Sequence, residues 1–337
     1  MTGKRVLVTG VTGMVGSHVA ARLVEAGYRV RGMVRPTSNR GDLDGVDIEW
    51  FEADLSDPAG LPPALADIDI VVHAAAHVGD WGPADKYRAI NVVALEHLLT
   101  AAHREGRLER WIQISSLGVY PPRHHYGTTE DVAPDPSGLD GYTRTKAEAE
   151  VLLKRHMEEH GFPAVILRPG FIYGPGDRHV VPRLIERIAT GQMKLIGGGD
   201  RVLNNTYVGN LWEAVLLAMT KDQALGEMFN VRDERLVTRN EFVHAIADYM
   251  KCPHPKHVPE GVARAAVVPI EWFARLRGAT EAPLLTRARI KFLTLNLDFS
   301  IDKAKSMLGY EPRTDFQDGM KETLRWADRA GLIPNGS

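Results

Sequence analysis

A loop with three glycines follows the first strand-like segment and opens the first helical pattern: Thr9-Gly10-Val11-Thr12-Gly13-Met14-Val15-Gly16, with spacing G-x-x-G-x-x-G. In such a loop the first glycine permits a tight turn, the second lets backbone approach a pyrophosphate, and the third lets the helix pack closely on the strand. The N-terminus of the helix then attracts the anion. In this strand–turn–helix context the loop predicts a dinucleotide site rather than a ligand-free turn. The residues predicted to bind the cofactor here are Gly10, Thr12, Gly13, Met14, Val15 and Gly16.

The first half of the chain alternates short apolar segments with helix-length patterns. Strands are expected at 5–9, 29–34, 47–52, 69–73, 110–115 and 163–168, and helices at 14–26, 57–66, 85–105 and 141–160. Such alternation indicates βαβ units and a parallel sheet with helices on both faces. The triplets Val6-Leu7-Val8 and Ile70-Val71-Val72 are apolar throughout, as expected of strands buried on both faces. The sequence therefore predicts an α/β fold with a doubly wound parallel sheet of the Rossmann type.

The regular alternation ends near residue 170. Turn-rich segments such as Gly174-Pro175-Gly176 and Gly197-Gly198-Gly199, together with short helical patterns, replace it. We therefore expect a dinucleotide-binding domain made of residues 1–170 and about 203–250. The remaining residues, about 171–202 and 251–337, are expected to form a smaller substrate-binding cap.

Composition and charge exclude several classes of protein. The 337 residues carry 41 basic and 43 acidic side chains, a net charge of −2, whereas a nucleic-acid surface normally shows a basic excess. No apolar run approaches about 18 residues, so no membrane span is expected. A signal peptide is not expected either, because the first strand begins at Arg5. The single cysteine, Cys252, favours a reducing cytoplasm, and the thirteen histidines show no metal-ligand spacing, so no metal site is predicted.

The end of the second expected strand bears on the choice of cofactor. Enzymes that prefer NAD place an acidic residue there, which binds the ribose 2′-hydroxyl. This chain has Val34 at that position, followed by Arg35 and, shortly afterwards, by Ser38, Asn39 and Arg40. Arginine and small polar groups suit a 2′-phosphate through charge-assisted hydrogen bonds. The sequence therefore predicts that NADP(H) is favoured over NAD(H), with Arg35 and Asn39 near the phosphate; the alternative is that Arg35 is a solvated strand-end residue.

Two further segments carry groups suited to carbonyl chemistry. Tyr142 and Lys146 are four residues apart at the start of a helical pattern and share a helical face. The ordinary tyrosine pKa is about 10, and an adjacent ammonium group is expected to lower the pKa of Tyr142, which makes the pair a general acid/base. Ser115 and Ser116 end the strand-like segment from Trp111, where open α/β sheets bind ligands. A hydroxyl there can donate a hydrogen bond to a substrate carbonyl.

The order of these motifs resembles the extended short-chain dehydrogenases/reductases, the epimerase/dehydratase superfamily, over nearly the whole chain. The segments that carry the resemblance are Thr9–Gly16, Asp54-Leu55, His73-Ala74-Ala75-Ala76, Asn91, Ser115-Ser116, Tyr142 with Lys146, Leu167–Asp177, Thr206–Asn210 and Leu308–Pro312.

The resemblance implies a role for each matched residue. It implies that Ser116 polarises the carbonyl, that Tyr142 transfers the proton, and that Lys146 tunes Tyr142 and holds the nicotinamide ribose. It places Asp54 and Leu55 beside the adenine. The other cofactor-binding residues that it implies are Ala74, Ala75, Ala76, Asn91, Pro169 and Ile172.

Two departures separate the chain from the nucleotide-sugar epimerases of this family. Phe171 stands where those enzymes carry an Asn that holds the sugar-nucleotide diphosphate, and Asn204-Asn205 stands where they carry Arg-Asp. The segments Val78-Gly79-Asp80-Trp81-Gly82 and Gly176-Asp177-Arg178-His179 are instead similar to the 3β-hydroxysteroid dehydrogenase/isomerase branch. That branch includes sterol dehydrogenases and bacterial reductases of 2-alkyl-3-keto acids. Val78, Trp81 and Phe171 are therefore candidates for an apolar substrate site; the alternative is that the rings belong to the core of the cap.

The function expected from these features is the interconversion of a ketone and a secondary alcohol on a largely apolar substrate. The first alternative is a nucleotide-sugar epimerase or dehydratase, which uses the same Tyr and Lys. The second is a non-catalytic cofactor-binding protein. The resemblance also implies a homodimer formed through helices 85–105 and 141–158.

The segment 262–276 is apolar with interspersed charges. It is interpreted as a packed cap helix rather than as a helix on a membrane surface, because Pro269 is expected to interrupt it and basic residues are few.

Overall fold

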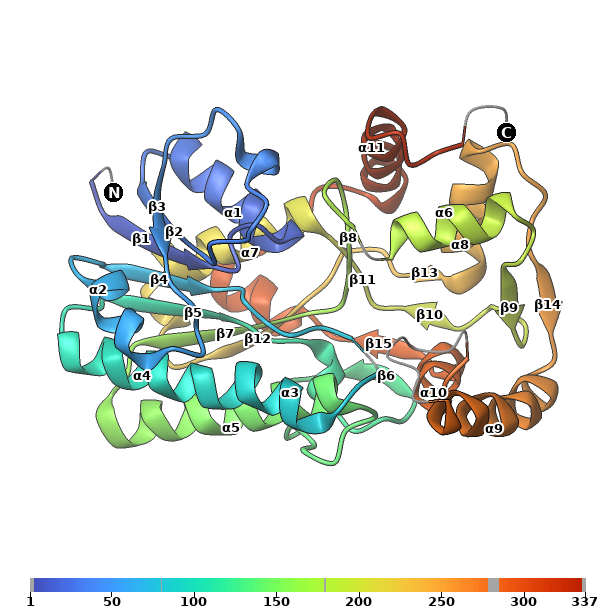
Figure 1. The fold of residues 1–337 in the computed structure, drawn as a ribbon, viewed down its shortest axis with the longest axis horizontal. Helices are drawn as coiled ribbons and strands as arrows, with labels where there is room; N and C mark the ends of the chain where they lie inside the picture. Colours follow the sequence, from blue (N-terminus) through green and yellow to red (C-terminus); the bar gives the residue numbers. More distant parts are fainter. Residues whose placement is uncertain (1–2, 80, 179, 278–284, 335–337) are drawn as a thin grey trace.

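A computed structural model describes residues 3–79, 81–178, 180–277 and 285–334, so the motif residues Asp80 and His179 lie outside the described residues. Its centre is a seven-stranded sheet in which all neighbouring strands pair in parallel (Figure 1). From one edge to the other the strands are β12 (Met228–Val231), β7 (Ala164–Pro169), β5 (Arg110–Ile114), β4 (Ile70–His73), β1 (Arg5–Thr9), β2 (Arg29–Val34) and β3 (Ile48–Glu52).

Helices cover both faces of this sheet. One face packs against α1 (Met14–Glu25) and α7 (Val208–Thr220), and the other packs against α2 (Leu61–Leu65), α4 (Ala94–Glu105) and α5 (Gly141–His160). The strand β1 shows how the sequence produces the layers. Val6 and Val8 belong to the apolar cluster with α1 and α7, whereas Leu7 belongs to the cluster on the other face. The predicted α/β fold with a doubly wound parallel sheet is confirmed.

Two of the predicted helices are irregular. The expected helix 57–66 is a 3₁₀ turn (Pro58–Gly60) followed by the short α2, because three prolines limit the backbone N–H groups available to a longer helix. The expected helix 85–105 consists of α3 (Ala84–Arg88), a π-helical turn (Ala89–Val93) and α4. The π turn contains Asn91, and such turns are frequent at functional sites.

The remaining elements form small two-stranded pairs and helices on the right of the sheet in Figure 1. The strand pairs are β8 (Phe171–Tyr173) with β11 (Asn205–Tyr207), β6 (His125–Thr128) with β15 (Leu297–Phe299), β9 (Lys194–Ile196) with β14 (Lys256–Val258), and β10 (Val202–Leu203) with β13 (Val237–Thr238). The helices are α6 (Val181–Ala189), α8 (Arg239–Tyr249), α9 (Glu260–Leu276), α10 (Arg287–Thr294) and α11 (Phe316–Arg329).

Pro269 does not interrupt α9, contrary to the prediction from the sequence. A proline inside a helix removes one N–H donor and leaves a carbonyl one turn earlier without its usual partner. Pro269 and Ala265, the residue that bears this carbonyl, are both exposed. Because water can satisfy that carbonyl, the helix continues to Leu276.

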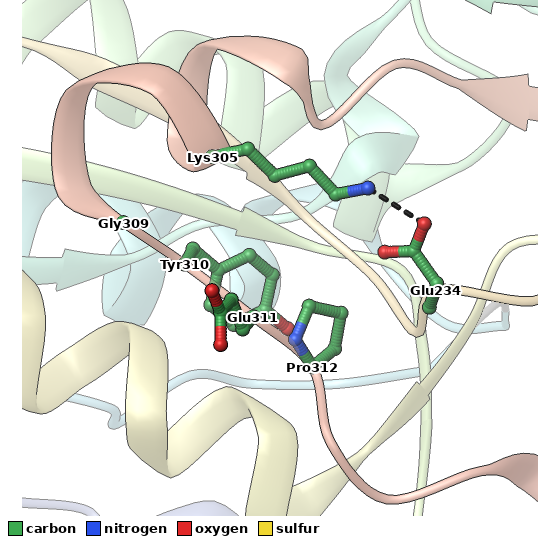
Figure 2. Close-up of a pocket in the computed structure, with 6 residues that line it drawn as sticks. All are labelled: Glu234, Lys305, Gly309, Tyr310, Glu311 and Pro312. Atoms are coloured by element: carbon green, nitrogen blue, oxygen red, sulfur yellow. Dashed lines mark hydrogen bonds and ion pairs between the residues drawn. The ribbon is translucent and has the colours of Figure 1, made fainter.

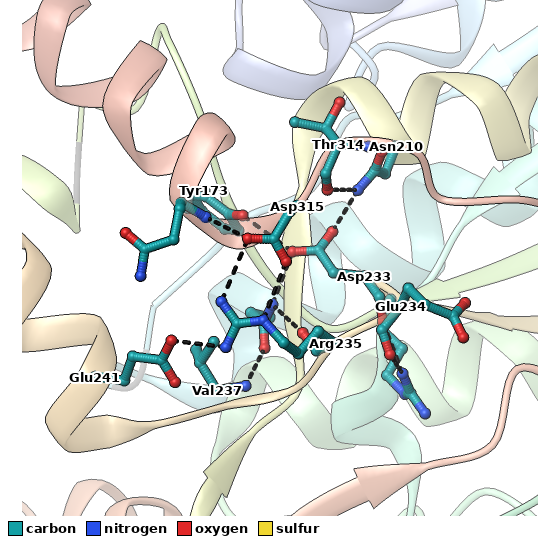
Figure 3. A network of polar contacts seen from close by, with 12 residues as sticks. Tyr173, Asn210, Asp233, Glu234, Arg235, Val237, Glu241, Thr314 and Asp315 are labelled. Carbon is teal, nitrogen blue, oxygen red and sulfur yellow. Dashed lines mark hydrogen bonds and ion pairs between the residues drawn. The ribbon is translucent and has the colours of Figure 1, made fainter.

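A buried carboxylate joins the sheet to the elements beside it. Asp233 follows β12 and accepts hydrogen bonds from the backbone N–H of Tyr207 (2.7 Å), the Asn205 and Asn210 amides (2.8 Å each) and the Tyr173 hydroxyl (3.0 Å), part of the network in Figure 3. Burial raises the pKa of Asp233, and these donors oppose that shift by stabilising the charged form. Asn205 is thus occupied by structural bonds within the protein.

Candidate active site

The glycine loop forms a tight turn between β1 and α1. Gly10 has φ +66°, and a Cβ added there would lie 2.7 Å from the backbone of Ala75. A Cβ at Gly16 would lie 2.1 Å from the Gly10 carbonyl oxygen, so the helix touches the strand backbone at this point. Gly13 caps α1 without a side-chain hydrogen bond, and the first turn carries no acidic residue. Met14 and Val15 pack on the two largest apolar clusters, which places the loop between the sheet and the elements beside it.

The end of β4 lies against the glycine loop, and we call the loop and this strand end together the glycine cradle. The Ala75 N–H donates to the Thr9 hydroxyl (3.3 Å), which is also hydrogen-bonded to Nδ1 of His73 (2.9 Å). Burial lowers the pKa of His73 to about 3, so the ring is neutral and adds no charge. Ala74, Ala75 and Ala76 are half-buried beside Gly10. An uncapped helix N-terminus beside backbone that only glycine permits fits the diphosphate of a dinucleotide.

The ends of β2 and β3 lie near each other. Arg35 is exposed, and its positive charge contributes to a lowered pKa at Asp54, although hydrogen bonds from Ser56 are the larger cause. Leu55 is partly buried against the cluster on the α2 side. The Asn39 side chain accepts from the Gly41 N–H (2.9 Å) and so shapes the loop after β2. Arg40 is engaged elsewhere, because it pairs with Glu52 at 2.6 Å.

Ser116 and Tyr142 lie together beyond the end of β5. The Ser116 hydroxyl is hydrogen-bonded to the Tyr142 phenol and also accepts from the Gly118 N–H at 3.0 Å. Tyr142 is held at the first turn of α5 by a capping box between Asp140 and Thr143. This box fixes the start of the helix and therefore the direction of the tyrosine.

Lys146 lies one turn further along α5 and is 4% exposed. Its ammonium group donates to the Ile114 carbonyl (2.8 Å) and lies 6.0 Å from the Tyr142 ring centroid. The expected lowering of the Tyr142 pKa is wrong for this structure. Burial raises the pKa of Tyr142 to about 12 and lowers the pKa of Lys146 to about 8. Loss of hydration around the tyrosine outweighs the hydrogen bond with Ser116, which favours the charged phenolate, and the nearby Asp140 charge adds to the rise.

Asn91 connects the π turn to two other segments. Its side chain accepts from the His77 N–H (2.7 Å) and donates to the His77 carbonyl (3.1 Å) and the Thr145 hydroxyl (3.0 Å). These bonds tie the segment after Ala76 to α5 next to Lys146. Asn91 thus positions the backbone on which other predicted site residues lie.

Sequence reasoning missed a buried ionic cluster beneath Lys146. Glu150 accepts hydrogen bonds from Nε (3.0 Å) and Nη2 (2.6 Å) of Arg168 and from the Ser115 hydroxyl. Nη1 of Arg168 donates to the Tyr120 hydroxyl (2.7 Å), which donates to Asn230 (2.7 Å). The available signals were a glutamate four residues after Lys146, hence on the same face of α5, and an arginine inside an apolar strand.

The three predicted substrate residues differ in exposure and packing. Val78 is 66% exposed, Trp81 is half-buried, and Phe171 packs edge-on against Phe242 with 5.5 Å between ring centroids. Pro169 is buried at the end of β7, and the half-buried Ile172 follows in β8. The cavity in Figure 2, about 420 Å³, contains none of the predicted site residues; it is lined by Glu234, Lys305, Gly309, Tyr310, Glu311 and Pro312.

Comparisons with known proteins find similar chains and similar folds. The 2-alkyl-3-oxoalkanoate reductase of Shewanella oneidensis is 29% identical over 330 residues, which cover 93% of this chain and 84% of that protein. A 3 beta-hydroxysteroid dehydrogenase/Delta 5-->4-isomerase of Mycobacterium tuberculosis is 30% identical and covers 95% and 89%. Among solved structures, UDP-glucuronic acid 4-epimerase from Bacillus cereus, in complex with UDP-glucuronic acid and NAD, superposes with a TM-score of 0.78 at 23% identity, covering 97% and 99%.

The sequence model of one family matches most of the chain. It is the NAD dependent epimerase/dehydratase family, and the match extends over residues 6–231, from β1 to the last strand of the sheet. The cradle for a dinucleotide and the group formed by Ser116, Tyr142 and Lys146 lie within this range. The chain therefore belongs to the NAD dependent epimerase/dehydratase family and is an NAD(P)-dependent dehydrogenase or reductase of the short-chain type.

Proposed function

We propose that this protein interconverts a ketone and a secondary alcohol on a largely apolar substrate and prefers NADP(H) to NAD(H). The observation that carries the proposal is the hydrogen-bonded pair of Ser116 and Tyr142 with Lys146 one turn away. Ser116 follows β5, which lies two strands from β1, the strand that leads into the glycine loop. The cofactor is held by the glycine loop, by Ala74–Ala76 and by the ends of β2 and β3. When bound, it supplies or accepts a hydride.

The chain's own residues handle the proton. Because the pKa of Tyr142 is raised to about 12, the phenol keeps its proton at neutral pH and is ready to donate it to the carbonyl oxygen during reduction. Ser116 donates a hydrogen bond to the same oxygen and holds it near Tyr142. Lys146 holds the nicotinamide ribose and stabilises the negative charge that develops on the phenol oxygen.

The apolar substrate class is supported by two observations. The relatives at 29% and 30% identity are named for an oxoalkanoate and a steroid, whereas the sugar-nucleotide epimerase structure is similar at 23%. In addition, the Phe171 ring packs against Phe242, and the Asn205 side-chain amide already donates to Asp233 and to the Arg235 carbonyl. Phe171 and Asn205 therefore offer no free hydrogen-bond donor to a diphosphate. The single Cys252 supports a reducing, cytoplasmic setting.

The test measures the change in nicotinamide absorbance across homologous series of ketones and secondary alcohols with NADPH and NADH. UDP-glucose and UDP-glucuronic acid are assayed in parallel for epimerisation without added cofactor. We expect kcat/KM to rise up to about fourfold for each added methylene until the site is full. Turnover of a UDP-sugar with no dependence on chain length would assign the protein to the epimerases. Cofactor binding without any turnover would make it a binding protein.

A further inference from the structure

Helix α9 is apolar on two opposite sides. Ala263 and Val267 lie buried along one side and pack against Ile290 of α10. Along the other side, each large apolar residue is between 50% and 68% exposed; these residues are Val262, Val268, Trp272, Phe273 and Leu276. We call these five residues the α9 apolar face. At about 100° per residue the two sides are almost diametrically opposed, so α10 covers one side and leaves the other uncovered.

The concentration of exposed apolar residues on this helix is unusual. Five of the eleven large hydrophobic residues exposed in the described part of the chain belong to the α9 apolar face. The rings of Trp272 and Phe273 lie 4.9 Å apart, which adds a continuous aromatic surface. Figure 1 shows α9 at the outer edge of the molecule, on the side away from the sheet. A contiguous apolar surface at the periphery indicates an interaction site.

The charge around this face indicates its partner. The segment 262–276 itself holds only two basic residues, but the longer segment 260–294, which includes α10, contains six basic and three acidic residues, although the whole chain has a net charge of −2. Arg264, at the border of the α9 apolar face, pairs with Glu260, and Arg287 at the start of α10 pairs with Glu271; both arginine side chains stay more than half exposed. The segment as a whole keeps an excess of three positive charges. Basic groups beside an apolar helical face are complementary to a surface that combines acyl chains with anionic headgroups.

A second copy of this chain is a poorer match for the same surface. A two-fold contact would place the α9 apolar face and its basic border against identical groups. Two segments that each carry an excess of three positive charges would then repel each other. Among the described residues, no helix has the length and apolarity needed to cross a bilayer, so the contact concerns the membrane surface only.

We propose that the α9 apolar face docks on anionic lipid surfaces, with the helix axis parallel to the membrane plane and Trp272 and Phe273 in the headgroup region. The test is sedimentation of the full chain with vesicles of phosphatidylcholine containing about 30% phosphatidylglycerol, and with vesicles of phosphatidylcholine alone. Binding is expected with the anionic vesicles and is expected to weaken in about 0.5 M salt, where charges are screened. Quenching of tryptophan fluorescence by brominated lipids reports the depth of Trp272.

The decisive variant is Trp272→Ser with Phe273→Ser, because both side chains are exposed and their loss leaves the fold intact. We expect its partition onto anionic vesicles to fall at least about tenfold. Leu225→Ser, at an exposed leucine outside the helix, is the control and should bind like the parent. Trp272→Phe should bind but lose part of the quenching. The readout needs no turnover, so it is independent of the proposed function.

Two results would overturn the proposal. One is a parent protein that binds neither vesicle, or a double variant that binds as well as the parent. The other is light scattering in which the double substitution turns a dimer into a monomer while the parent ignores vesicles. That second outcome would assign the face to a second copy of the chain.

Discussion

Arg168 on β7 forms a buried ion pair with Glu150, which lies one helical turn beyond Lys146 on α5. Nη2 and Oε2 are 2.6 Å apart, and the residues are 0% and 3% exposed. Glu150 also accepts a hydrogen bond from the hydroxyl of Ser115, the neighbour of Ser116. The pair therefore joins β7 to the end of β5 and to helix α5. Ser116 follows β5, and Tyr142 and Lys146 lie on α5, so the pair fixes the two elements that carry the three proposed catalytic residues.

Replacing the acid of this pair is expected to destabilise the fold strongly. Glu150→Gln leaves the Arg168 charge buried and without a counter-ion, which costs about 3–5 kcal/mol in the free energy of unfolding. Urea unfolding measures the change. Glu158→Gln is the matched control, since Glu158 pairs with Lys154 on the exposed side of the same helix and its loss costs about 0–1 kcal/mol. Similar small losses for both variants would contradict the role given to Glu150.

Tyr142→Phe is expected to lower kcat by a factor on the order of 10²–10⁴ and to leave thermal stability and cofactor affinity unchanged, because only the transferable proton is lost. Tyr126→Phe, at an exposed tyrosine, serves as the control. The parent enzyme should oxidise alcohols faster as pH rises, since the pKa of Tyr142 is about 12 and oxidation requires the deprotonated oxygen. A variant that retains more than about half the parent rate, with chemistry rate-limiting, removes Tyr142 from the mechanism.

The preference for NADPH is expected to depend on Arg35. Arg35→Ala should reduce the difference between the binding free energies of NADPH and NADH by about 1–3 kcal/mol, because a charge-assisted bond to the 2′-phosphate is lost. Titration of each cofactor gives the dissociation constants. Arg29→Ala, at the opposite end of β2, should change neither. Equal dissociation constants for the two cofactors in the parent protein would show that the prediction is wrong.

The glycine cradle is tested by a single methyl group. Gly10→Ala and Gly106→Ala both place a side chain at positive φ, +66° and +63°, so both carry similar backbone strain. Only at Gly10 does the new Cβ meet other backbone atoms, 2.7 Å from Ala75. We expect Gly10→Ala to weaken NADPH binding at least about tenfold and Gly106→Ala to keep parent affinity at a cost of about 1 kcal/mol in stability. Equal cofactor affinities for the two variants would contradict a binding role for this turn.

A homodimer through α4 and α5 remains a prediction. Val151 on α5 is 55% exposed, so it is available for a contact across a two-fold axis. Light scattering at micromolar concentration should give twice the chain mass for the parent, and Val151→Arg should shift it toward the monomer. Leu225→Arg, distant in sequence and outside both helices, should not. A monomeric parent would refute this assembly.

The central sheet could be predicted because its strands have a distinctive pattern in the sequence. Triplets such as Val6-Leu7-Val8 have no polar alternation, and helix-length segments separate them, so few other folds are compatible. The short strand pairs beside the sheet were not predictable. The strand β6, for example, pairs with β15, which lies far away in the sequence, and neither carries a distinctive pattern. Whether such short segments form strands depends on the tertiary packing around them.

In the candidate site, too, some features could be predicted from the sequence and others depend on the tertiary structure. The glycine loop and the spacing of Tyr142 and Lys146 are local patterns, and the sequence shows them directly. The raised pKa of Tyr142 depends on how completely the surrounding elements exclude water, which spacing does not report. The pairing of Glu150 with Arg168 likewise depends on which strand lies beneath α5.

The pairing of β6 with β15 also sets an order of events during synthesis. The ribosome delivers residues 125–128 well before residues 297–299, because more than 160 residues lie between the two segments in the sequence. Domains tend to fold from the N-terminus as they appear, so β1 to β5 can assemble while β6 still lacks its partner. Until Phe299 has left the exit tunnel, the nascent protein exposes an unpaired strand edge, the kind of segment that chaperones protect and that otherwise nucleates aggregation.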